Sequence, residues 1–317
     1  MASSVNGKYA LVTGAGSGNN LEFTKLLLEN GCSVMMADLK LNAEAVALLD
    51  TYAPHAGEDT NGGRTEINGH RRPTAHFHKT DVTSWPQLSA LWEATLAAFP
   101  SINIVVPGAG VFEPPSVSFW QAPKSETNPD SVSRDAADSD PGHYRLIDVN
   151  LVAPIRLSQL AIGYWTQKKD RTPGDANLVL FGSIAARIAA LATPLYIASK
   201  HAIVAFARSL GALRDTVGIR VGCVAPGPVA TAIFEGFEKA AEDAEMIPIH
   251  QVADAMMQLV VNDAYGDGTI LQVTPGKTYV VPLYNAPPIG EADLKMPGLG
   301  AINDQVIHNL RTKGLQV

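Results

Sequence analysis

Tyr196 and Lys200 are the two residues of this chain best suited, by type and spacing, to move a proton. Pro194 and the apolar run from Ile203 to Leu210 predict a helix here, and residues four apart on a helix share one face. A free phenol has a pKa of about 10, and a nearby ammonium favours its ionised form. We therefore expect Lys200 to lower the pKa of Tyr196, so that the phenol can act as a general acid or base.

Two further polar residues could complete such a site. Ser183 follows the strand-like run from Asn177 to Phe181, and its hydroxyl could hold a substrate oxygen by a hydrogen bond. Asn150 stands between apolar neighbours in a helical pattern, which argues for burial with a polar partner. A tyrosine and a lysine at this spacing also occur on ordinary amphipathic helices, so the order of the motifs along the chain has to decide.

A glycine-rich turn near the N-terminus could bind an anionic group. The octapeptide from Thr13 to Asn20 joins a strand pattern to the helical pattern from Leu21 to Glu29. Gly14 and Gly18 would let the backbone approach a pyrophosphate, and the free N–H groups at the helix start favour negative charge. The dinucleotide motif GxGxxG is not matched, because Asn19 stands where its third glycine should be, and an ordinary βα turn is the alternative.

Asp38 supports the binding of a dinucleotide at this turn. It closes the second strand pattern, 20 residues after Gly18. An acidic side chain there accepts hydrogen bonds from ribose hydroxyls and would repel a ribose 2′-phosphate. The turn and Asp38 together predict NAD in preference to NADP, although Asp38 alone could equally cap a helix.

Short apolar runs alternate with longer helical patterns along the chain. The runs lack the period-two alternation of half-exposed strands, which suits a parallel sheet covered by helices on both faces. The fold expected is therefore a single α/β domain with a doubly wound parallel sheet. The predicted strands are Tyr9 to Thr13, Ser33 to Ala37, Thr74 to His78, Asn103 to Val106, Asn177 to Phe181, Ile219 to Val224 and Thr269 to Val273.

Two segments interrupt this rhythm, and a third follows it. Residues 53–72, rich in Gly, His and Arg, and residues 113–141, rich in Pro, Asp and Ser, are typical of surface insertions. Residues 276–317 form a tail with little periodicity. We expect residues 1–275 to form the dinucleotide-binding and catalytic domain, and the tail to pack on the same domain.

Composition narrows the possible partners. The net charge of −7 comes without a long basic run, which argues against nucleic acid, and no apolar stretch reaches the ~18 residues of a membrane span. Cys32 and Cys223 lie in apolar strand-like runs, so we expect buried free thiols and a cytoplasmic protein. His70, His76 and His78 lack a complementary carboxylate or cysteine at ligand spacing, and no metal is expected.

The order of these motifs resembles that of the short-chain dehydrogenase/reductase superfamily, over about residues 7 to 275. A phosphate turn is followed by a serine at a strand end, the Tyr–Lys pair, and Pro-Gly after the next strand. The resemblance implies a Rossmann fold and hydride transfer between NAD and a secondary alcohol or ketone. It also implies that Asn150 completes the catalytic set by holding a water of the proton relay. The catalytic residues are then Asn150, Ser183, Tyr196 and Lys200.

The resemblance extends to the cofactor contacts, with two departures. Asn20 replaces the last glycine of the family's TGxxxGxG turn, where asparagine is the residue next most tolerant of left-handed backbone. Pro107 and Gly108 replace both asparagines of its NNAG motif, which leaves backbone contact plausible there. The cofactor residues implied are Gly14, Gly18, Asn19, Asn20, Asp38, Asp81, Val82, Gly108, Ala109, Tyr196, Lys200, Pro226, Gly227, Val229 and Thr231.

Two of these positions have an ordinary structural alternative. Asp81 follows the third predicted strand, and its side chain could instead cap a helix starting near Ser84. Thr231 lies in the segment from Pro226 that resembles the family's loop over nicotinamide, but it could also cap a short helix.

Within the superfamily the chain is most similar to the hydroxyprostaglandin-dehydrogenase-like group. The similarity rests on the sequence from Phe112 to Pro115, on Phe119-Trp120 and on the Pro-rich insertion. It implies a bulky, mainly apolar secondary alcohol as substrate. Phe112, Phe119, Trp120 and Ile184 could line the substrate pocket, but Phe119 and Trp120 could equally pack the insertion onto the body.

Two other functions remain open on the same fold. One is an NAD(H)-binding sensor or scaffold without turnover, and the other is a lyase or cyclase without net redox change. The proton-transfer residues favour the enzyme over the sensor, since binding alone does not need a proton relay. The helical patterns from Asn150 to Trp165 and from Leu195 to Leu213 carry wide apolar surfaces, so we expect a homodimer or homotetramer.

Overall fold

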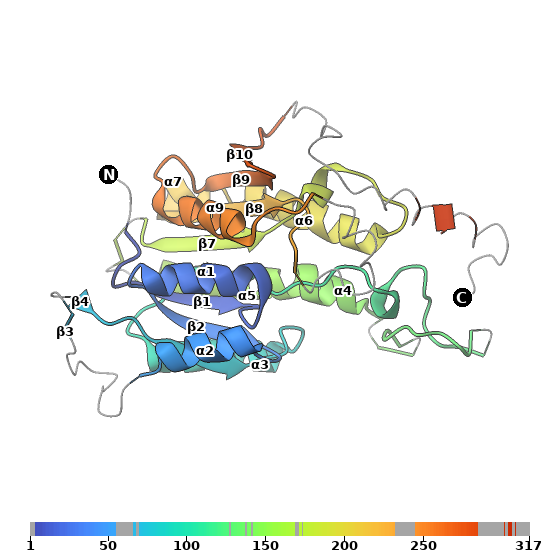
Figure 1. Cartoon of the computed structure of the whole chain (residues 1–317), viewed down its shortest axis with the longest axis horizontal. Helices are drawn as coiled ribbons and strands as arrows, with labels where there is room; N and C mark the ends of the chain where they lie inside the picture. The colour runs from blue at the N-terminus through green and yellow to red at the C-terminus, as the bar shows by residue number, and fades with distance from the viewer. Residues whose placement is uncertain are drawn as a thin grey trace.

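Eight strands form one sheet, whose order is β10-β9-β8-β7-β6-β1-β2-β5 (Figure 1). The computed structural model describes residues 4–54, 66–67, 70–126, 128–136, 138–140, 142–168, 171–172, 174–231 and 245–284, with residues 301, 304, 305 and 308. The strands are β1 (Tyr9–Thr13), β2 (Ser33–Asp38), β5 (Ala75–Lys79), β6 (Ile104–Val106), β7 (Ala176–Phe181), β8 (Ile219–Pro226), β9 (Asp267–Thr274) and β10 (Lys277–Val280). All but β10 pair in parallel, so the doubly wound α/β fold is confirmed.

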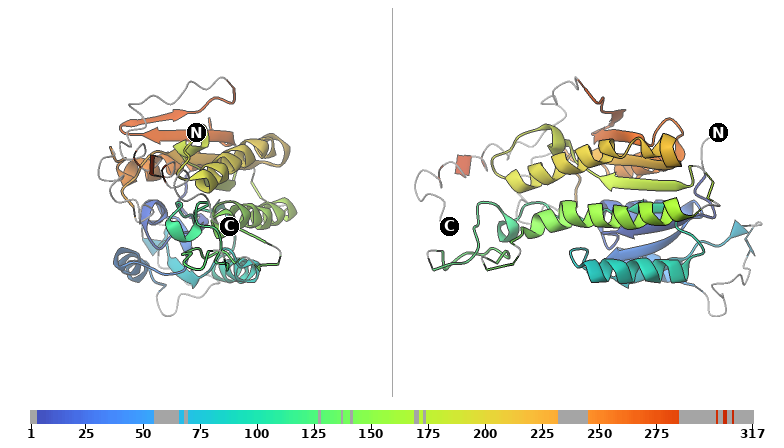
Figure 2. Two further views of the ribbon diagram at one scale, coloured as in Figure 1. Left: turned by 90° about the vertical axis from the view of Figure 1, so that its right-hand side faces the viewer. Right: turned by 180° about the vertical axis from the view of Figure 1, so that it is seen from behind.

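Helices cover both faces of the sheet (Figure 2). One face carries α1 (Gly18–Glu29), α2 (Ala43–Thr51) and α9 (Ile249–Val261), and the other carries α3 (Trp85–Ala98), α5 (Ala153–Gln167) and α6 (Pro194–Ser209), with the short α4 (Arg145–Ile147) leading into α5 and α7 (Leu213–Val217) following α6. Alternate residues of a strand enter different cores: Val12 packs with the α1 and α9 side, whereas Leu11 packs with the α5 and α6 side. This double coverage explains the continuous apolar runs, and β8 is buried at every position.

The two predicted insertions leave opposite edges of the sheet (Figure 1). Of residues 53–72, the described part contains a two-stranded hairpin, β3 (Glu66–Ile67) with β4 (His70–Arg71), and residues 55–65 lie outside the described part of the chain. The segment 113–141 extends from the carboxyl edge, the side of the sheet where the parallel strands end. It includes a short 3₁₀ turn, η1 (Pro115–Val117). Glu113 and Asp135 of this segment are buried, so it packs against the body.

The tail begins with an element that the sequence did not predict. β10 pairs antiparallel with β9 through a tight turn in which Gly276 has a φ of +68°. Arg208 of α6 donates to the carbonyl oxygens of Val281 and Pro282, at 3.1 and 2.9 Å. The residues just after the predicted domain boundary therefore belong to the same sheet.

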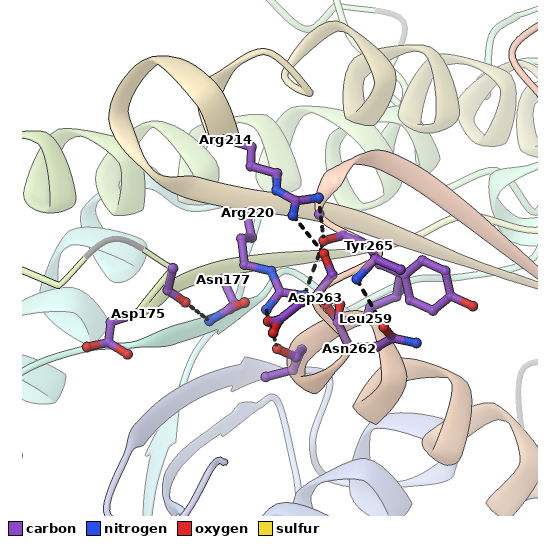
Figure 3. Close-up of polar contacts among 12 residues, drawn as sticks. Asp175, Asn177, Arg214, Arg220, Leu259, Asn262, Asp263 and Tyr265 are labelled. Carbon is purple, nitrogen blue, oxygen red and sulfur yellow. Dashed lines mark hydrogen bonds and ion pairs between the residues drawn. The ribbon is translucent and has the colours of Figure 1, made fainter. Parts of the chain in front are cut away.

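At the amino edge of the sheet, where the parallel strands begin, Arg220 caps the end of a helix (Figure 3). Arg220 of β8 donates to the carbonyl oxygens of Leu259, Val260, Asn262 and Tyr265, at 2.6 to 3.2 Å. These oxygens belong to the end of α9 and the turn after it, where intrahelical donors run out. A guanidinium with five N–H donors can serve several of them at once.

One helical segment in the described part of the chain, Arg145–Gln167, is long and apolar enough to cross a membrane by length and composition alone. In this structure it lies against the sheet and buries Leu157, Ala161 and Trp165 in the core. Its apolar character therefore has a structural explanation within the fold.

Both cysteines are buried free thiols, as expected. Burial raises the pKa of the Cys223 thiol to about 12, and it raises that of Cys32 further still. His76 packs edge-on against Phe99, with ring centroids 5.3 Å apart. Among the described residues, no group of three His, Cys, Asp or Glu side chains is arranged to hold a metal ion.

Candidate functional site

The predicted site residues gather at the carboxyl edge of the sheet. There β1, β2, β6, β7 and β8 end, while α1 and α6 begin. Parallel strands bring distant parts of the chain together at this edge. The glycine-rich turn, Asp38, Gly108, Ser183, and the pair Tyr196 and Lys200 all follow or adjoin these strand ends.

The glycine-rich turn needs its glycines for conformation and for space. Gly14 and Gly18 have φ angles of +73° and +61°, which side-chain-bearing residues rarely adopt. A Cβ on Gly14 would also lie 2.8 Å from the Cα of Ala109. The turn is thus pressed against the loop after β6, which brings two predicted cofactor-binding segments together.

The Asp38 carboxylate holds this turn in place. Its Oδ2 accepts a hydrogen bond from the backbone N–H of Gly16 at 2.9 Å, and its Oδ1 accepts from Leu39 N at 2.6 Å. A carboxylate has about four acceptor positions, so capacity for ribose hydroxyls is left over. The geometry fits the role predicted for Asp38.

The start of α1 fits a pyrophosphate. Ser17, at the N-cap, makes no side-chain capping bond, and the Asn19 Oδ1 is buried without a partner. The first N–H groups of a helix lack intrahelical partners and carry the positive end of its dipole. Gly14, Gly18 and the first turn of α1 are therefore the groups that would hold the phosphates of a dinucleotide.

The two departures from the family pattern compensate each other. Asn20 Nδ2 donates to the Gly108 carbonyl oxygen at 2.8 Å, and a Cβ on Gly108 would lie 2.4 Å from Asn20 Oδ1. Any side chain at 108 would displace the Asn20 amide from its present position, so glycine there leaves room for it. Asn20 also lies inside α1, so tolerance of left-handed backbone does not explain it. Thr13 Oγ1 completes the contact by accepting from Gly108 N at 3.0 Å.

Asp81 does not cap α3, because Ser84 takes that role by accepting from Gln87 N at 3.4 Å. The Oδ1 of Asp81 instead accepts from the backbone and hydroxyl of Thr83, and its Oδ2 forms an ion pair with Arg145 at 3.3 Å. Burial would raise the pKa of Asp81, but these contacts outweigh it and hold the pKa below its usual value. The neighbouring side chain of Val82 packs with that of Ala109 beside the turn.

Tyr196 and Lys200 lie together near the start of α6, with Ser183 alongside. The Lys200 Nζ is 5.5 Å from the centre of the Tyr196 ring and donates to the Phe181 carbonyl oxygen at 2.9 Å. Ser183 Oγ accepts from Ala185 N at 3.1 Å and donates to the Pro226 oxygen at 3.3 Å. The three predicted proton-transfer side chains are thus brought to one place.

The pKa directions differ from the sequence expectation. Burial raises the pKa of Tyr196, and a hydrogen bond with the Ser183 side chain only partly opposes this. Burial lowers the pKa of Lys200 to about 8. The expectation that Lys200 lowers the pKa of Tyr196 is therefore not met in this structure, because removal from water dominates both groups.

Asn150 lies in a π-helical turn, η2 (Asp148–Val152), between α4 and α5. Its side chain pairs with the Val111 backbone twice: Oδ1 accepts from the N–H and Nδ2 donates to the oxygen, both at 2.8 Å. Nδ2 also reaches Ser199 Oγ at 3.3 Å. Burial with a partner is confirmed, and π turns are frequent at functional sites. The water-holding role implied by the resemblance stays a prediction.

The loop after β8 reaches the phosphate turn. Gly227 N donates to the Val273 oxygen at 2.9 Å, and Val229 bridges to Ile247. A Cβ on Gly18 would lie 3.4 Å from Thr231 Cγ2. Thr231 is thus placed between the two regions that would contact a dinucleotide, and the following residues 232–244 lie outside the described part.

Glu113 is the site residue that sequence reasoning missed. The residue is 1% exposed, and its carboxylate accepts from the backbone N–H of Tyr196 at 2.8 Å. Next to it, Phe112 packs edge-on against the Tyr196 ring, with centroids 4.7 Å apart. The sequence did contain a signal for it. Glu113 is an acidic residue placed between Phe112 and two prolines, shortly after β6.

The four side chains considered for the substrate pocket have different surroundings. Phe112 touches Tyr196, and Ile184 is buried beside Ser183. Trp120 Nε1 donates to the Leu191 oxygen at 2.7 Å, which ties the insertion to the segment before α6. Phe119 packs on Trp120 and is 39% exposed. For Trp120 the structure thus shows packing onto the body.

Comparison with known proteins agrees with this geometry. The family described as short chain dehydrogenase matches residues 8–242. Similar proteins include (+)-borneol dehydrogenase 1 of Salvia officinalis, 29% identical over 74% of this chain and 75% of its own. The 15-hydroxyprostaglandin dehydrogenase [NAD(+)] of Homo sapiens is 26% identical over 86% and 93%. Cis-4-hydroxycyclohexanecarboxylate dehydrogenase of Sinomonas cyclohexanicum is 28% identical over 86% and 97%.

A solved structure of a short chain dehydrogenase/reductase family protein superimposes with a TM-score of 0.60. It is 23% identical and covers 86% of this chain and 97% of its own, so it supports the fold. The family match covers most of the chain, and the motifs that carried the resemblance lie together at one edge of the sheet. The chain therefore belongs to the short-chain dehydrogenase family of nicotinamide-dependent oxidoreductases.

Proposed function

We propose that this protein transfers hydride between NAD(H) and a secondary alcohol or ketone of a bulky, mainly apolar small molecule, with Tyr196 as the general acid or base. The observation that carries the proposal is the grouping of Ser183, Tyr196 and Lys200 at the sheet edge that also holds the glycine-rich turn. Binding of a dinucleotide alone would not need a phenol and an ammonium buried side by side.

Each of the three side chains has a definite task in this proposal. Bound NAD would supply the hydride acceptor, and NADH the donor. Tyr196 takes the hydroxyl proton when an alcohol is oxidised and returns a proton to the alkoxide when a ketone is reduced. Ser183 holds the substrate oxygen by a hydrogen bond. Lys200 holds its ammonium 5.5 Å from the centre of the phenol ring, where its charge opposes the rise that burial causes in the pKa of Tyr196 without overcoming it.

The preference for NAD rests on Asp38. Its carboxylate is fixed at the end of β2 by Gly16 and Leu39, where a ribose 2′-phosphate would meet a negative charge. The 15-hydroxyprostaglandin dehydrogenases among the similar proteins carry NAD(+) in their names. We therefore infer NAD for this chain as well.

The cofactor proposal is tested by titrating the protein with NADH and with NADPH while following nicotinamide fluorescence. NADH should bind markedly more tightly, and Asp38→Ser should reduce that preference. Asp50→Ser, at an exposed position on α2, is the matched control and should leave the preference unchanged. Tighter binding of NADPH would overturn the argument from Asp38, and binding of neither would overturn the function.

The substrate class rests on apolar neighbours of the phenol. Phe112, Val117, Leu146 and Ala185 form one buried cluster with Tyr196. A substrate oxygen placed at Tyr196 would thus lie beside apolar surface. NAD-coupled oxidation should be faster with (+)-borneol than with 2-propanol, and failure of every apolar secondary alcohol in a panel would contradict the proposal.

We also propose that the protein forms homo-oligomers through α5 and α6. Leu160 and Tyr164 on α5, and Val204 and Phe206 on α6, are only partly covered by the core. In light scattering, Leu160→Glu with Phe206→Glu should lower the mass to that of a monomer. Leu96→Glu on α3, where the side chain is 38% exposed, should not.

A further inference from the structure

We propose that Glu113 is a positioning residue for Tyr196. Its side chain joins the first turn of α6 to residues 118 and 119 of the loop that follows β6. The proposal rests on the proposed function only in assigning Tyr196 its catalytic task. The structural link itself can be tested without turnover.

Both carboxylate oxygens of Glu113 are occupied, and by different segments. Oε2 accepts from the backbone N–H of Tyr196 at 2.8 Å. Oε1 accepts from the backbone N–H of Phe119 at 3.0 Å and from Ser118 Oγ at 3.4 Å. The backbone of Leu195 also helps to offset the rise that burial causes in the pKa of this carboxyl. One buried side chain thus bridges two segments far apart in the sequence.

The start of α6 depends on this carboxylate. Thr193, the N-cap residue, makes no side-chain capping bond, and Pro194 has no N–H to satisfy. Glu113 accepts from the N–H of Tyr196, while Ile197 N reaches the Thr193 oxygen at 3.0 Å. An orphan donor in the first turn of this helix is therefore satisfied by a residue from the loop after β6.

The same loop touches the phenol and the segment before it. Phe112 packs on the Tyr196 ring, and Trp120 Nε1 donates to the Leu191 oxygen. Pro114 and Pro115 restrict the backbone between Glu113 and Phe119. Glu113 lies at the centre of these contacts, so its loss should release the loop and the first turn of α6 together.

Glutamine cannot replace Glu113, although it has the same shape. Both oxygens accept from N–H groups, and an amide offers one acceptor and one NH₂ donor. Whichever way the amide turns, a donor would face either Tyr196 N or Phe119 N. Aspartate would keep two acceptors, but its shorter side chain could reach one segment and not both.

The test is hydrogen exchange followed by mass spectrometry on wild type, Glu113→Gln and Glu113→Asp. Exchange in Glu113→Gln should accelerate at least tenfold in peptides covering 193–198 and 116–121, while peptides from β1 and β7 stay unchanged. Glu113→Asp should accelerate one of the two segments. Glu93→Gln, at an exposed position on α3, makes the same charge change and should alter neither.

The activity arm uses the most reactive alcohol of the substrate panel, with NADH affinity measured in parallel. In Glu113→Gln, kcat should fall at least tenfold, with the NADH dissociation constant within about twofold of wild type. Unchanged exchange in the 193–198 peptide would overturn the proposal, as would equal acceleration in all peptides, which would mark Glu113 as an ordinary core residue. If no alcohol is turned over, the function fails while the exchange result still decides the role of Glu113.

Discussion

At the amino edge of the sheet Arg220 caps the end of α9 (Figure 3), whereas at the carboxyl edge no side chain of the described residues caps the start of α1. Both places are helix ends with orphan backbone groups. The protein supplies its own cation to the carbonyl oxygens of α9 and leaves the N–H groups of α1 available. The difference separates an edge with a structural role from the edge at which we propose that the cofactor binds.

The start of α6 is intermediate between these two ends. It lies at the same edge as the start of α1, but it is capped by Glu113 from within the protein. A capped end fixes the residue that follows it, and here that residue is Tyr196. The carboxyl edge therefore combines an open helix end, suited to a phosphate, with a capped one that holds Tyr196, the proposed acid or base.

The largest effect should come from Tyr196→Phe. This change removes the proton donor and acceptor and leaves the ring packing on Phe112 in place, so kcat should fall roughly 10³-fold. The NADH dissociation constant should stay close to that of wild type. Steady-state turnover and fluorescence titration measure the two quantities. Retained turnover would remove Tyr196 from the chemistry and favour another proton carrier at this edge.

At the opposite edge, Arg220→Met should affect stability and not function. Four carbonyl oxygens would lose a buried charged donor, which should lower the free energy of unfolding by about 3 to 4 kcal/mol. Arg214→Met is the matched control, since Arg214 donates to Tyr265 and Asp263 oxygens from a less buried position; its loss should cost about 1 kcal/mol. Urea unfolding and NADH titration check both variants. A large loss of NADH affinity would contradict the division between the edges.

Lys200 should make stability depend on pH. Its pKa is lowered to about 8 in the folded state, while an unfolded lysine titrates at about 10.4. Between these values the folded state binds fewer protons than the unfolded state, so the contribution of Lys200 to stability rises with pH. Below about pH 8 Lys200 is charged in the folded state as well, so the whole cost of burying its charge lowers the free energy of unfolding.

Lys200→Met should therefore raise the free energy of unfolding more at pH 7 than at pH 10.5. The difference between the two increases should be about 3 kcal/mol. The hydrogen bond to Phe181 is lost at both pH values and cancels from this difference. Lys277→Met, at an exposed position on β10, serves as the control. Urea unfolding at the two pH values provides the measurement, and equal gains at both would show that burial does not govern Lys200.

The smallest effect concerns the pair Asn20 and Gly108 at the open helix end. Gly108→Asn should destabilise by overlap with Asn20, and Asn20→Gly should remove the 2.8 Å hydrogen bond. The double variant, which restores the family pattern at both positions, should be more stable than the sum of the single changes by about 1 to 2 kcal/mol. A double-mutant cycle in urea measures this, and strict additivity would refute the compensation.

The sequence predicted much of this arrangement because parallel strands have a simple signature. Each of the seven predicted strands is present within one or two residues of its expected ends. The site residues follow strand ends, and the topology of a doubly wound sheet brings such positions to one edge. Order along the chain was thus enough to predict that Asp38, Ser183 and Tyr196 share an edge.

What sequence reasoning missed depends on contacts between distant residues. Glu113 caps a helix that begins about 80 residues later, and no local pattern encodes such a partner. Asn20 and Gly108 looked like two separate departures until their contact was known. β10 has too few residues for a clear alternation, and burial, which sets the pKa of Tyr196 and Lys200, is a tertiary property.

The strand order also has a consequence for how the chain folds. β1 lies inside the sheet, between β2 and β6, with Ala10 opposite Ile104. During synthesis the first strand is therefore complete long before its second neighbour exists, and one of its hydrogen-bonding edges stays open in the meantime. Pairings of such large sequence separation are slow to form and expose apolar strands to aggregation. Closure of β6 onto β1 should be a late step of refolding, and until then one edge of β1, which is an interior strand in the finished protein, stays unpaired.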